Sequence, residues 1–248
     1  MSRPRSIPWD GQIRAVFSLL WTLLNAPILD QKFDIFLSYI LKNMNQPLHT
    51  EILSDSQLEL TQLVGSFKDN YYLVGGTALA LQIGHRRSID FDLFSNEEIS
   101  TSQILKQVKS VAEIERVLVD STIELTIMVN GVKLTWYAFG FKLLPAVDGT
   151  FCRMPDPVTI GAMKLYALGR RAKWKDYVDL YFLLKEFDFT KLATKAEEIF
   201  GTAFEEKLAR IQLSYFEDIN YQEEIDFMPG FSVEDEEVKK YLTSIALG

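Results

Sequence analysis

The hydrophobic pattern changes twice along the chain and predicts three regions. In residues 12–45 apolar side chains recur at helical spacing with a break at Pro27, which predicts helices at about 11–25 and 30–44, and a third at about 49–68. Residues 71–139 instead contain short aromatic and β-branched runs, and the pattern is helical again from Val158 onward. We therefore expect an N-terminal helical region (1–68), a core containing a sheet (69–150) and a C-terminal helical domain (151–248). The predicted fold class is α/β (α+β): a small mixed sheet with flanking helices plus a helical C-terminal region.

Five runs in the middle region are predicted to be strands: 71–74, 88–94, 114–119, 122–129 and 132–139. Asn130-Gly131 separates the last two, which is the strongest short signal for a β-hairpin. A helix is expected at about 101–111, a loop at about 145–157 and a second loop at about 228–231. Thr50 or Ser54 is expected to cap the helix at 49–68.

The stretch YYLVGGTALALQIGHRRSIDFDLFS (71–95) is the centre of the predicted core. Gly75 and Gly76 end its first strand and allow a tight turn that approaches a ligand closely. Thr77 is expected to cap a helix at 78–82, whose free N–H groups and dipole would favour a phosphate. A glycine pair by itself usually marks only a turn. A phosphate-binding role for this pair is supported by the carboxylates that come after it in the chain.

The second strand of this stretch alternates between polar and apolar residues. Asp90 and Asp92 are predicted on one face, and Ile89, Phe91 and Leu93 on the other. Two carboxylates two residues apart suit a shared Mg²⁺ ion, because hard divalent cations take oxygen ligands and bridge to phosphates. Taken alone, such a pair is more often a solvated sheet face.

A second constellation lies in the segment IGAMKLYALGRRAKWKDYVDLYFLL (160–184). Lys164, Leu168 and Arg171 are expected on one helix face, and Asp176 and Asp179 one turn apart on the next helix. From spacing alone this segment is an ordinary amphipathic helical hairpin with its charges in water.

Charge and composition narrow the classes of function. A net charge of −8 and a pI near 4.9 disfavour a protein that coats nucleic acid, although a local basic patch stays possible. Cys152 is the only cysteine, which excludes an internal disulfide and a cysteine-based metal site, and with only two histidines (His49 and His85) a zinc site is not expected. The first apolar run, 15–24, has no cleavage signal and is too short to span a bilayer, so we expect a cytoplasmic protein with no membrane partner.

The glycine pair, with Asp-x-Asp about fifteen residues after it, resembles the nucleotidyltransferase superfamily centred on DNA polymerase β. More narrowly, GGTALAL and GHRRSIDFDLF resemble the AbiEii/AbiGii-type nucleotidyltransferase toxin family of prokaryotic toxin–antitoxin and phage-defence systems. In that family a helical K-x-x-A-x-x-R…K-D-x-x-D segment comes after the core. It stands here as Lys164, Ala167, Arg170 or Arg171, Lys175, Asp176 and Asp179. The resemblance covers residues 68–187 and leaves unassigned the N-terminal helices and the acidic segment 217–237.

The resemblance implies a small mixed nucleotidyltransferase sheet and an enzyme that transfers a nucleotidyl group from a nucleoside triphosphate, bound with Mg²⁺, to an acceptor. For some relatives the acceptor is the 3′ end of tRNA, and a separately encoded antitoxin is the implied protein partner. The residues implied to bind the nucleotide are Gly75, Gly76, Thr77, Arg86, Arg87 and Ser88. The residues implied to carry the catalysis are Asp90, Asp92, Lys164 and Asp176, with Asp90 and Asp92 holding the metal. A modification of Ser88 would close the site by charge repulsion.

One position departs from the superfamily pattern. Many nucleotidyltransferases carry a third carboxylate on the strand after the hairpin turn, where this chain has Thr135. Glu124 or Asp176 is a possible substitute, and a nucleotide-binding or regulatory module without transfer activity is the alternative to an active enzyme. A small molecule or a protein as acceptor is a further alternative. The acidic net charge favours a cationic small molecule, whereas a basic rim would favour an RNA end; the residues that would form it are Arg86, Arg87, Arg170, Arg171, Lys173 and Lys175.

Overall fold

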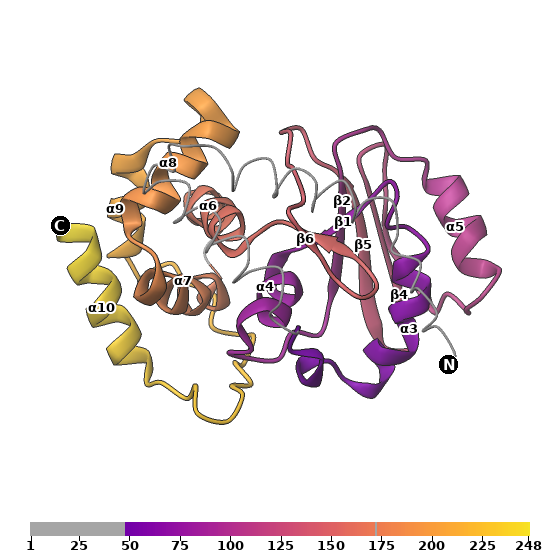
Figure 1. Cartoon of the computed structure of the whole chain (residues 1–248), viewed down its shortest axis with the longest axis horizontal. Coiled ribbons are helices and arrows are strands. Elements are labelled where there is room, and N and C mark those ends of the chain that lie inside the picture. The colour runs from indigo at the N-terminus through magenta and orange to yellow at the C-terminus, as the bar shows by residue number, and fades with distance from the viewer. Residues whose placement is uncertain (1–47, 172) are drawn as a thin grey trace, which may run out of the picture. The chain divides into compact units, whose positions relative to one another are not determined.

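The computed structural model describes residues 48–171 and 173–248, and the helices expected at 11–25 and 30–44 lie outside them. Pro47–Gly248 forms one compact unit. Its described residues contain a five-stranded mixed sheet and eight α-helices, which confirms the predicted fold class (Figure 1). The three-part division at residues 68 and 150 stays a prediction.

The sheet has the strand order β1-β2-β5-β4-β3. Its strands are β1 (Tyr72–Val74), β2 (Phe91–Ser95), β3 (Arg116–Asp120), β4 (Glu124–Val129) and β5 (Val132–Ala138). Strands β2 and β5 run parallel, and the other neighbours are antiparallel. The hairpin at Asn130-Gly131 is confirmed: both residues have positive φ, 50° and 71°, as the tight turn between β4 and β5 requires. The loop expected at 145–157 contains a short hairpin that was not predicted, β6 (Val147–Asp148) and β7 (Arg153–Met154).

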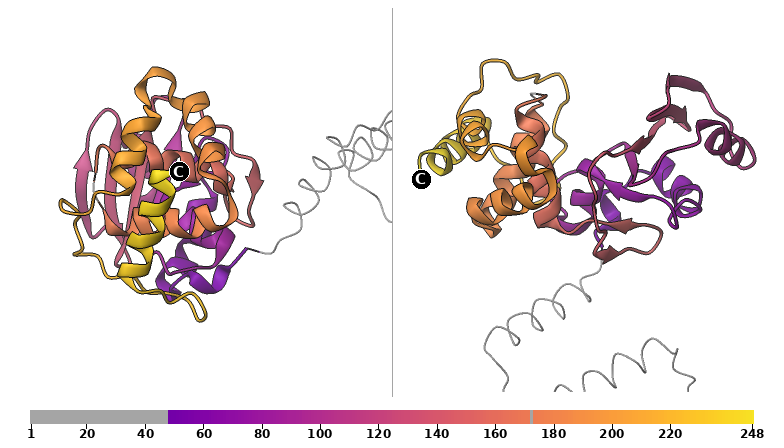
Figure 2. Two further views of the ribbon diagram at one scale, coloured as in Figure 1. Left: turned by 90° about the vertical axis from the view of Figure 1, so that its left-hand side faces the viewer. Right: turned by 90° about the horizontal axis from the view of Figure 1, so that it is seen from above.

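The two faces of the sheet differ in character because strand side chains alternate. One face is apolar, and its residues join the main core together with those of α3 (Asp55–Gly65) and α5 (Thr101–Lys109). Both helices lie on the side of the sheet away from the C-terminal helices (Figures 1 and 2). The core residues of β2, β4 and β5 are Phe91, Leu93, Leu125, Ile127, Val129, Val132, Leu134 and Trp136. The opposite face is therefore the one that carries polar side chains toward the C-terminal helices.

The starts of helices α3 and α4 are set by the residues immediately around them. Ser54 caps α3 in a capping box with Gln57, and a 3₁₀ turn, η1 (Thr50–Ile52), precedes this cap. Helix α4 (Gly75–Ile83) begins directly at the glycine pair. The expected cap at Thr77 is wrong, because Val74 occupies the N-cap position and the Thr77 side chain bonds elsewhere.

Strand β2 is shorter than predicted. It begins at Phe91, so Asp90 lies just before it. The side chain of Ile89 is 71% exposed, so the expectation that it shares the buried face of Phe91 and Leu93 is wrong.

The C-terminal half is a bundle of five helices: α6 (Pro157–Leu168), α7 (Trp174–Glu186), α8 (Phe189–Phe200), α9 (Glu206–Leu213) and α10 (Asp235–Leu247). Asp156 caps α6 through a hydrogen bond from the Thr159 N–H (2.8 Å), and Pro157 fits the first turn. A 3₁₀ turn, η2 (Gly201–Ala203), comes directly after α8. The loop expected at 228–231 is longer than predicted, because no helix occurs between residues 214 and 234.

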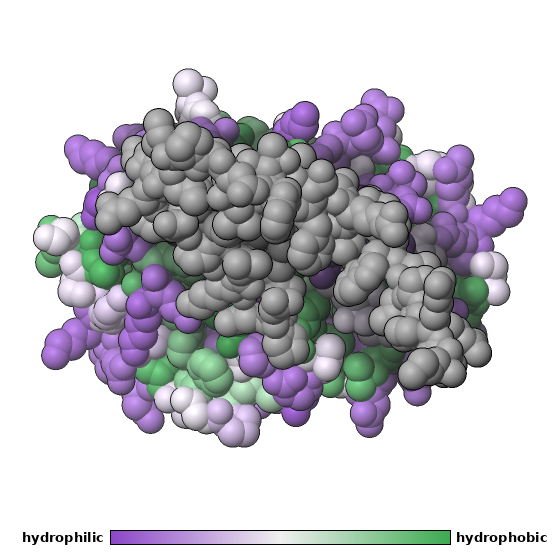
Figure 3. Space-filling view, viewed as in Figure 1, coloured by the Kyte–Doolittle hydropathy of each residue, from purple (hydrophilic) through white to green (hydrophobic). Residues whose placement is uncertain are grey.

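Among the described residues, no helix combines the length and the apolar character that crossing a membrane requires. On the face seen in Figure 3, hydrophilic side chains project around the edge of the described unit, in keeping with a chain of which 24% is charged.

Candidate active site

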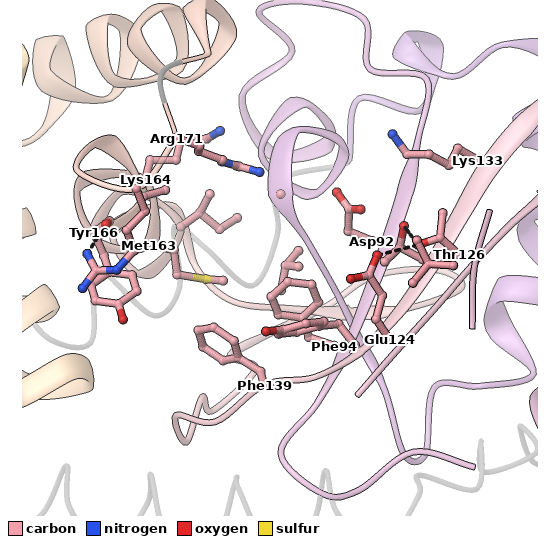
Figure 4. A pocket seen from close by; sticks show the side chains of 18 of the residues that line it. Asp92, Phe94, Glu124, Thr126, Lys133, Phe139, Met163, Lys164, Tyr166 and Arg171 are labelled. Carbon is pink, nitrogen blue, oxygen red and sulfur yellow. Dashed lines mark hydrogen bonds between the residues drawn. The ribbon is translucent and has the colours of Figure 1, made fainter. Parts of the chain in front are cut away.

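A cavity of about 640 Å³ opens between the polar face of the sheet and helix α6. Figure 4 shows Asp92, Glu124 and Lys133 on the sheet side of the cavity and Lys164 and Arg171 on the other. Aromatic side chains lie between these two charged groups. A cavity of this size is within the range that holds a small-molecule substrate.

The acidic end of the cavity is formed by one residue of the predicted aspartate pair, Asp92, with Asp90 at its border. Asp92 lines the cavity and lies directly opposite Thr135 on the parallel strand β5. Asp90, just before the strand, forms an ion pair with Lys133 (Nζ to Oδ2, 2.6 Å). Burial, and then the charge of Asp90, raises the pKa of Asp92. Two carboxylates that repel each other in this way form a site that a cation would stabilise.

The two glycines bring the start of α4 against this acidic end. Gly75 has φ +72°, and a Cβ added there would lie 2.7 Å from Oδ2 of Asp92. A Cβ on Gly76 would lie 2.6 Å from Nη2 of Arg86 and 3.0 Å from Oγ of Ser88. Both positions therefore require glycine: Gly75 for its backbone conformation, and both for the close approach of neighbouring side chains.

Thr77 and Ser88 hold the segment that precedes β2. The buried Thr77 hydroxyl hydrogen-bonds the Ser88 hydroxyl (2.9 Å) and donates to the backbone carbonyl of Asp90. The role that the structure supports for Thr77 is thus to position Asp90. Thr77 and Ser88 do not line the cavity, so their predicted contact with the nucleotide stays a prediction.

A buried cluster of charged side chains joins the segment before β2 to helices α6 and α7. Asp179 accepts two hydrogen bonds from Arg86 (2.6 and 2.8 Å) and bonds Nε2 of His85 (2.7 Å). Nζ of Lys164 lies 2.6 Å from Asp179 and 2.7 Å from Asp176. Burial by itself would raise the pKa of Asp179, but the charges of Arg86 and Lys164 lower it well below its usual range.

This cluster changes the interpretation of the two predicted arginines. Arg86 is buried, with its guanidinium bound to Asp179, and Arg87 forms an ion pair with Asp226 (3.4 Å). Neither residue lines the cavity. Their contact with phosphate stays a prediction: the Arg86 guanidinium binds Asp179 in this structure, and Arg87 forms an exposed ion pair.

Asp176 is also buried away from the cavity, paired with Lys164 and with Arg171 (Nε to Oδ2, 3.1 Å). The side chain of Arg171 is 51% exposed and lines the cavity, as Lys164 does. Asp176 therefore positions two cations at the edge of the cavity. Its own carboxylate does not face the cavity, where a substrate would lie.

Comparison with known proteins shows the family to which this chain belongs. The sequence model of the family described as "Nucleotidyl transferase AbiEii toxin, Type IV TA system" matches residues 60–135 and 121–243, which together span most of the chain. The chain belongs to the AbiEii nucleotidyltransferase toxin family. It is accordingly a nucleotidyltransferase of a toxin–antitoxin family, as the resemblance in its motifs indicated.

Individual proteins also match the chain over most of its length. An uncharacterized protein of Aquifex aeolicus (strain VF5), aq_aa25, is 28% identical over 187 residues, which are 70% of this chain and 89% of the relative. The crystal structure of JHP933 from Helicobacter pylori matches with a TM-score of 0.51 and 21% identity, over 79% of this chain and 92% of that one. MenT4, a nucleotidyltransferase toxin of Mycobacterium tuberculosis, matches with a TM-score of 0.50 and 12% identity, over 77% and 81% of the two chains. The two structural likenesses show a shared fold.

Several cavity residues of this AbiEii member were not predicted from the sequence. Lys133 and Tyr137 flank Thr135 at alternate positions on β5, so all three lie on the polar face. Of the two substitutes considered for a third carboxylate, Glu124 lines the cavity and Asp176 does not. Glu124 accepts a hydrogen bond from Thr126 (2.8 Å), whose hydroxyl is 3.2 Å from that of Thr135. Alternation along β5 was the signal that could have identified Lys133.

Replacing Gly75 by alanine should inactivate the AbiEii-type site. The new Cβ would lie 2.7 Å from Oδ2 of Asp92 and would force an unfavourable positive φ of +72° on a residue with a side chain. We expect transfer activity to fall at least about tenfold, since displacing a site group by about 1 Å has effects of this size or more. The rate of nucleotidyl transfer measures it. Gly131→Ala is the control, because Gly131 also has positive φ (+71°) but a Cβ there meets nothing within 4 Å; equal activity losses in the two variants would contradict the interpretation.

The buried histidine should make the stability of this family member depend on pH. Burial lowers the pKa of His85 in the folded protein, whereas an unfolded histidine titrates near 6.5. Below pH 6.5 the unfolded chain thus binds a proton that the folded chain does not, and the free energy of unfolding should fall by up to about 1.4 kcal/mol per pH unit. Urea unfolding between pH 7 and pH 5 measures the slope. Asp179 does not contribute in this window, because its pKa is lowered from an already acidic value.

The matched variant for that slope is His85→Gln, whose side-chain amide can still donate to Asp179. It should lose most of the pH dependence between 5 and 6.5. If its slope equals that of the wild type, His85 is not the group responsible.

Proposed function

We propose that the chain is an Mg²⁺-dependent toxin enzyme that transfers a nucleotidyl group from a nucleoside triphosphate to an acceptor at the Asp90–Asp92 end of the cavity. One observation carries this proposal. The aspartate pair, the start of helix α4 and the cations Lys133, Lys164 and Arg171 all belong to one cavity or its immediate border. Transfer at a phosphorus requires oxygen ligands for a metal and positive charge for the leaving pyrophosphate.

Asp90 and Asp92 fit the metal that this chemistry requires. They are hard oxygen donors at neighbouring positions, and burial with mutual repulsion disfavours the charged form of Asp92 when no cation is beside it. No group of three metal-binding side chains occurs among the residues that the structure describes, so water and phosphate oxygens would complete the coordination. When bound, Mg²⁺ would polarise the phosphate oxygens and offset charge that develops during displacement.

The chain's own residues supply the rest of the proposed site. The N–H groups at the start of α4, at Gly75 and Gly76, provide donors for phosphate oxygens beside Asp92. Arg171 and Lys164 carry positive charge on the opposite side of the cavity. Asp176 acts through these cations, because it orients both of them. The proposal thus keeps Asp176 in the site but gives it a positioning role.

The proposed acceptor is the 3′ end of a tRNA, and the proposed setting is a cytoplasmic toxin–antitoxin system, active in phage defence, with a separately encoded antitoxin. Arg170 and Arg171 at the cavity support an RNA end as acceptor. The wider basic rim expected from the sequence is reduced, because Lys173 and Lys175 both pair with Glu223 of the acidic segment 217–237. A protein or a small cationic molecule as acceptor is an outcome that a labelling experiment separates.

The test is incubation of the full chain with each of the four α-³²P-labelled nucleoside triphosphates, Mg²⁺ and total cellular RNA. The control is the double variant Asp90→Ala/Asp92→Ala. Label on tRNA-sized RNA with the wild type alone would support the proposal and identify the nucleotide. Label only on the protein or on a small acceptor would reject RNA as the acceptor. The absence of label from every acceptor would favour a nucleotide-binding module that has lost transfer.

A further inference from the structure

The apolar part of the cavity contains three aromatic rings on the polar face of the sheet: Phe94, Tyr137 and Phe139, here named the aromatic platform. The Phe94 ring lies 5.1 Å from each of the other two, centroid to centroid, with interplanar angles of 44° and 38°. All three side chains are half-buried and line the cavity. The rings meet at tilted angles, so they do not cover one another's faces in parallel stacks.

The register of the sheet fixes the distance between the aromatic platform and the carboxylates. Asp92 pairs with Thr135, and two residues further along the same two strands Phe94 pairs with Tyr137. Two residues along a strand correspond to about 7 Å. The rings therefore lie two residues beyond the proposed metal site on the same face of the sheet. That separation suits a nucleotide whose phosphate is at the metal site and whose base is on the rings.

Two rings of the aromatic platform are supported by neighbours on the same face of the sheet. Phe94 and Phe139 pack against a small second apolar cluster formed by Tyr72, Val74 and Leu143, and Tyr72 is the β1 residue paired with Phe94. Because that cluster is buried, these two rings are held in place before any ligand arrives. Pre-organised side chains reduce the entropic cost of binding.

The Tyr166 ring on the opposite wall of the cavity cannot offer an equivalent surface. Tyr166 on α6 stacks on Phe200 (3.8 Å between centroids, 8° between planes), and the Arg170 guanidinium lies 3.5 Å from the Tyr166 centroid. Groups this close must occupy opposite faces, so both faces of the Tyr166 ring are covered. Met163, also on α6, presents a flexible apolar side chain across from the platform (Figure 4). A flat ring on the platform would thus be enclosed between aromatic rings and Met163.

We propose that the aromatic platform binds the base of the incoming nucleoside triphosphate. The inference rests on the proposed function, since it assigns the triphosphate to the Asp92 end of the same cavity. Bases stack on aromatic side chains with little regard to their identity, because every base has a π face. The platform would therefore hold any of the four bases and give the enzyme most of its discrimination between a nucleotide and a bare polyphosphate.

The test measures binding, so that it does not depend on transfer. Each of the four nucleoside triphosphates and inorganic tripolyphosphate is titrated, with Mg²⁺, into the full-length wild type and into Phe94→Leu and Tyr137→Leu. Leucine keeps apolar volume but removes the ring. Each variant should bind the nucleotides about tenfold or more weakly, the loss of one base–aromatic stack, and tripolyphosphate within about twofold of the wild type. Phe141→Leu is the matched control: Phe141 contacts Phe139 (5.6 Å) but does not line the cavity.

Three outcomes would overturn the inference. Nucleotide affinity that is unchanged in both variants would show that the rings do not hold a base. An equal loss for tripolyphosphate would show that the rings only maintain the shape of the site. In steady-state transfer, a raised KM for the RNA acceptor with an unchanged KM for the nucleotide would assign the rings to the acceptor. Failure of the proposed function would give a different result. The wild type would then transfer no nucleotide but would still bind nucleoside triphosphates more tightly than tripolyphosphate.

Discussion

The Asp92→Asn variant should lose at least about a hundredfold in nucleotidyl transfer while remaining as stable as the wild type. Asn keeps the shape of the side chain but loses the negative charge that would hold a divalent cation beside the start of α4. The loss of one electrostatic contribution to a transition state commonly costs about 10²–10³ in rate. Stability should not fall, because the half-buried wild-type carboxylate is partly desolvated and is repelled by Asp90. Transfer of labelled nucleotide and thermal unfolding of the same samples measure the two effects.

The matched control for Asp92→Asn is Asp120→Asn. Asp120 is an exposed aspartate on the edge strand β3 of the same sheet and does not line the cavity. It should transfer nucleotide at the wild-type rate. Wild-type transfer by Asp92→Asn would remove Asp92 from the site and, with it, the assignment of this cavity as the catalytic one.

The fold could be predicted well wherever short-range chemistry decides the structure. Asn130-Gly131 requires a tight hairpin, and Ser54 with Gln57 is a complete start signal for a helix. The start of β2 is different. Residues 88–90 alternate like a strand, yet the Gln57 amide donates to the Ser88 carbonyl (2.8 Å) and Thr77 donates to the Asp90 carbonyl. Helices α3 and α4 thus take the backbone groups that a sheet would use, and no local pattern shows this.

The candidate site also combines features that local sequence predicts with features that depend on long-range contacts. The glycine pair and the aspartate pair lie within the single stretch 71–95, and their chemistry could be inferred from order and spacing. Lys133 and two rings of the aromatic platform, Tyr137 and Phe139, come near Asp92 only because β2 pairs in parallel with β5, a strand far along the chain. Arg86 shows a long-range contact that no local pattern indicates. It lies shortly before Asp90, which suggests a phosphate contact, but Asp179, 93 residues away, binds its guanidinium.

The Asp179→Asn substitution should have the largest effect on stability in this protein, a loss of about 3–5 kcal/mol in the free energy of unfolding. The Asp179 carboxylate is 0% exposed and contacts three side chains, those of His85, Arg86 and Lys164. Removing its charge leaves the buried Arg86 guanidinium without its counterion, and breaking a buried pair in this way costs about that much. Urea unfolding at pH 7 measures the loss. Glu198→Gln is the control, because its ion pair with Lys195 is exposed and should be worth less than about 1 kcal/mol.

The same substitution tests whether this buried cluster supports the active site. Asp179 on α7 binds Arg86, and a Cβ on Gly76 would lie 2.6 Å from Nη2 of that arginine. The cluster therefore connects the helical half with the start of α4 beside Asp92. At a temperature where Asp179→Asn is still folded, we expect both its transfer rate and its affinity for tripolyphosphate to fall. The backbone N–H groups at the start of α4 would no longer be held in position. A variant that loses less than about 1 kcal/mol would show that water or Asp176 replaces the lost charge. A variant that is unstable but fully active while folded would show that the cluster serves the fold alone.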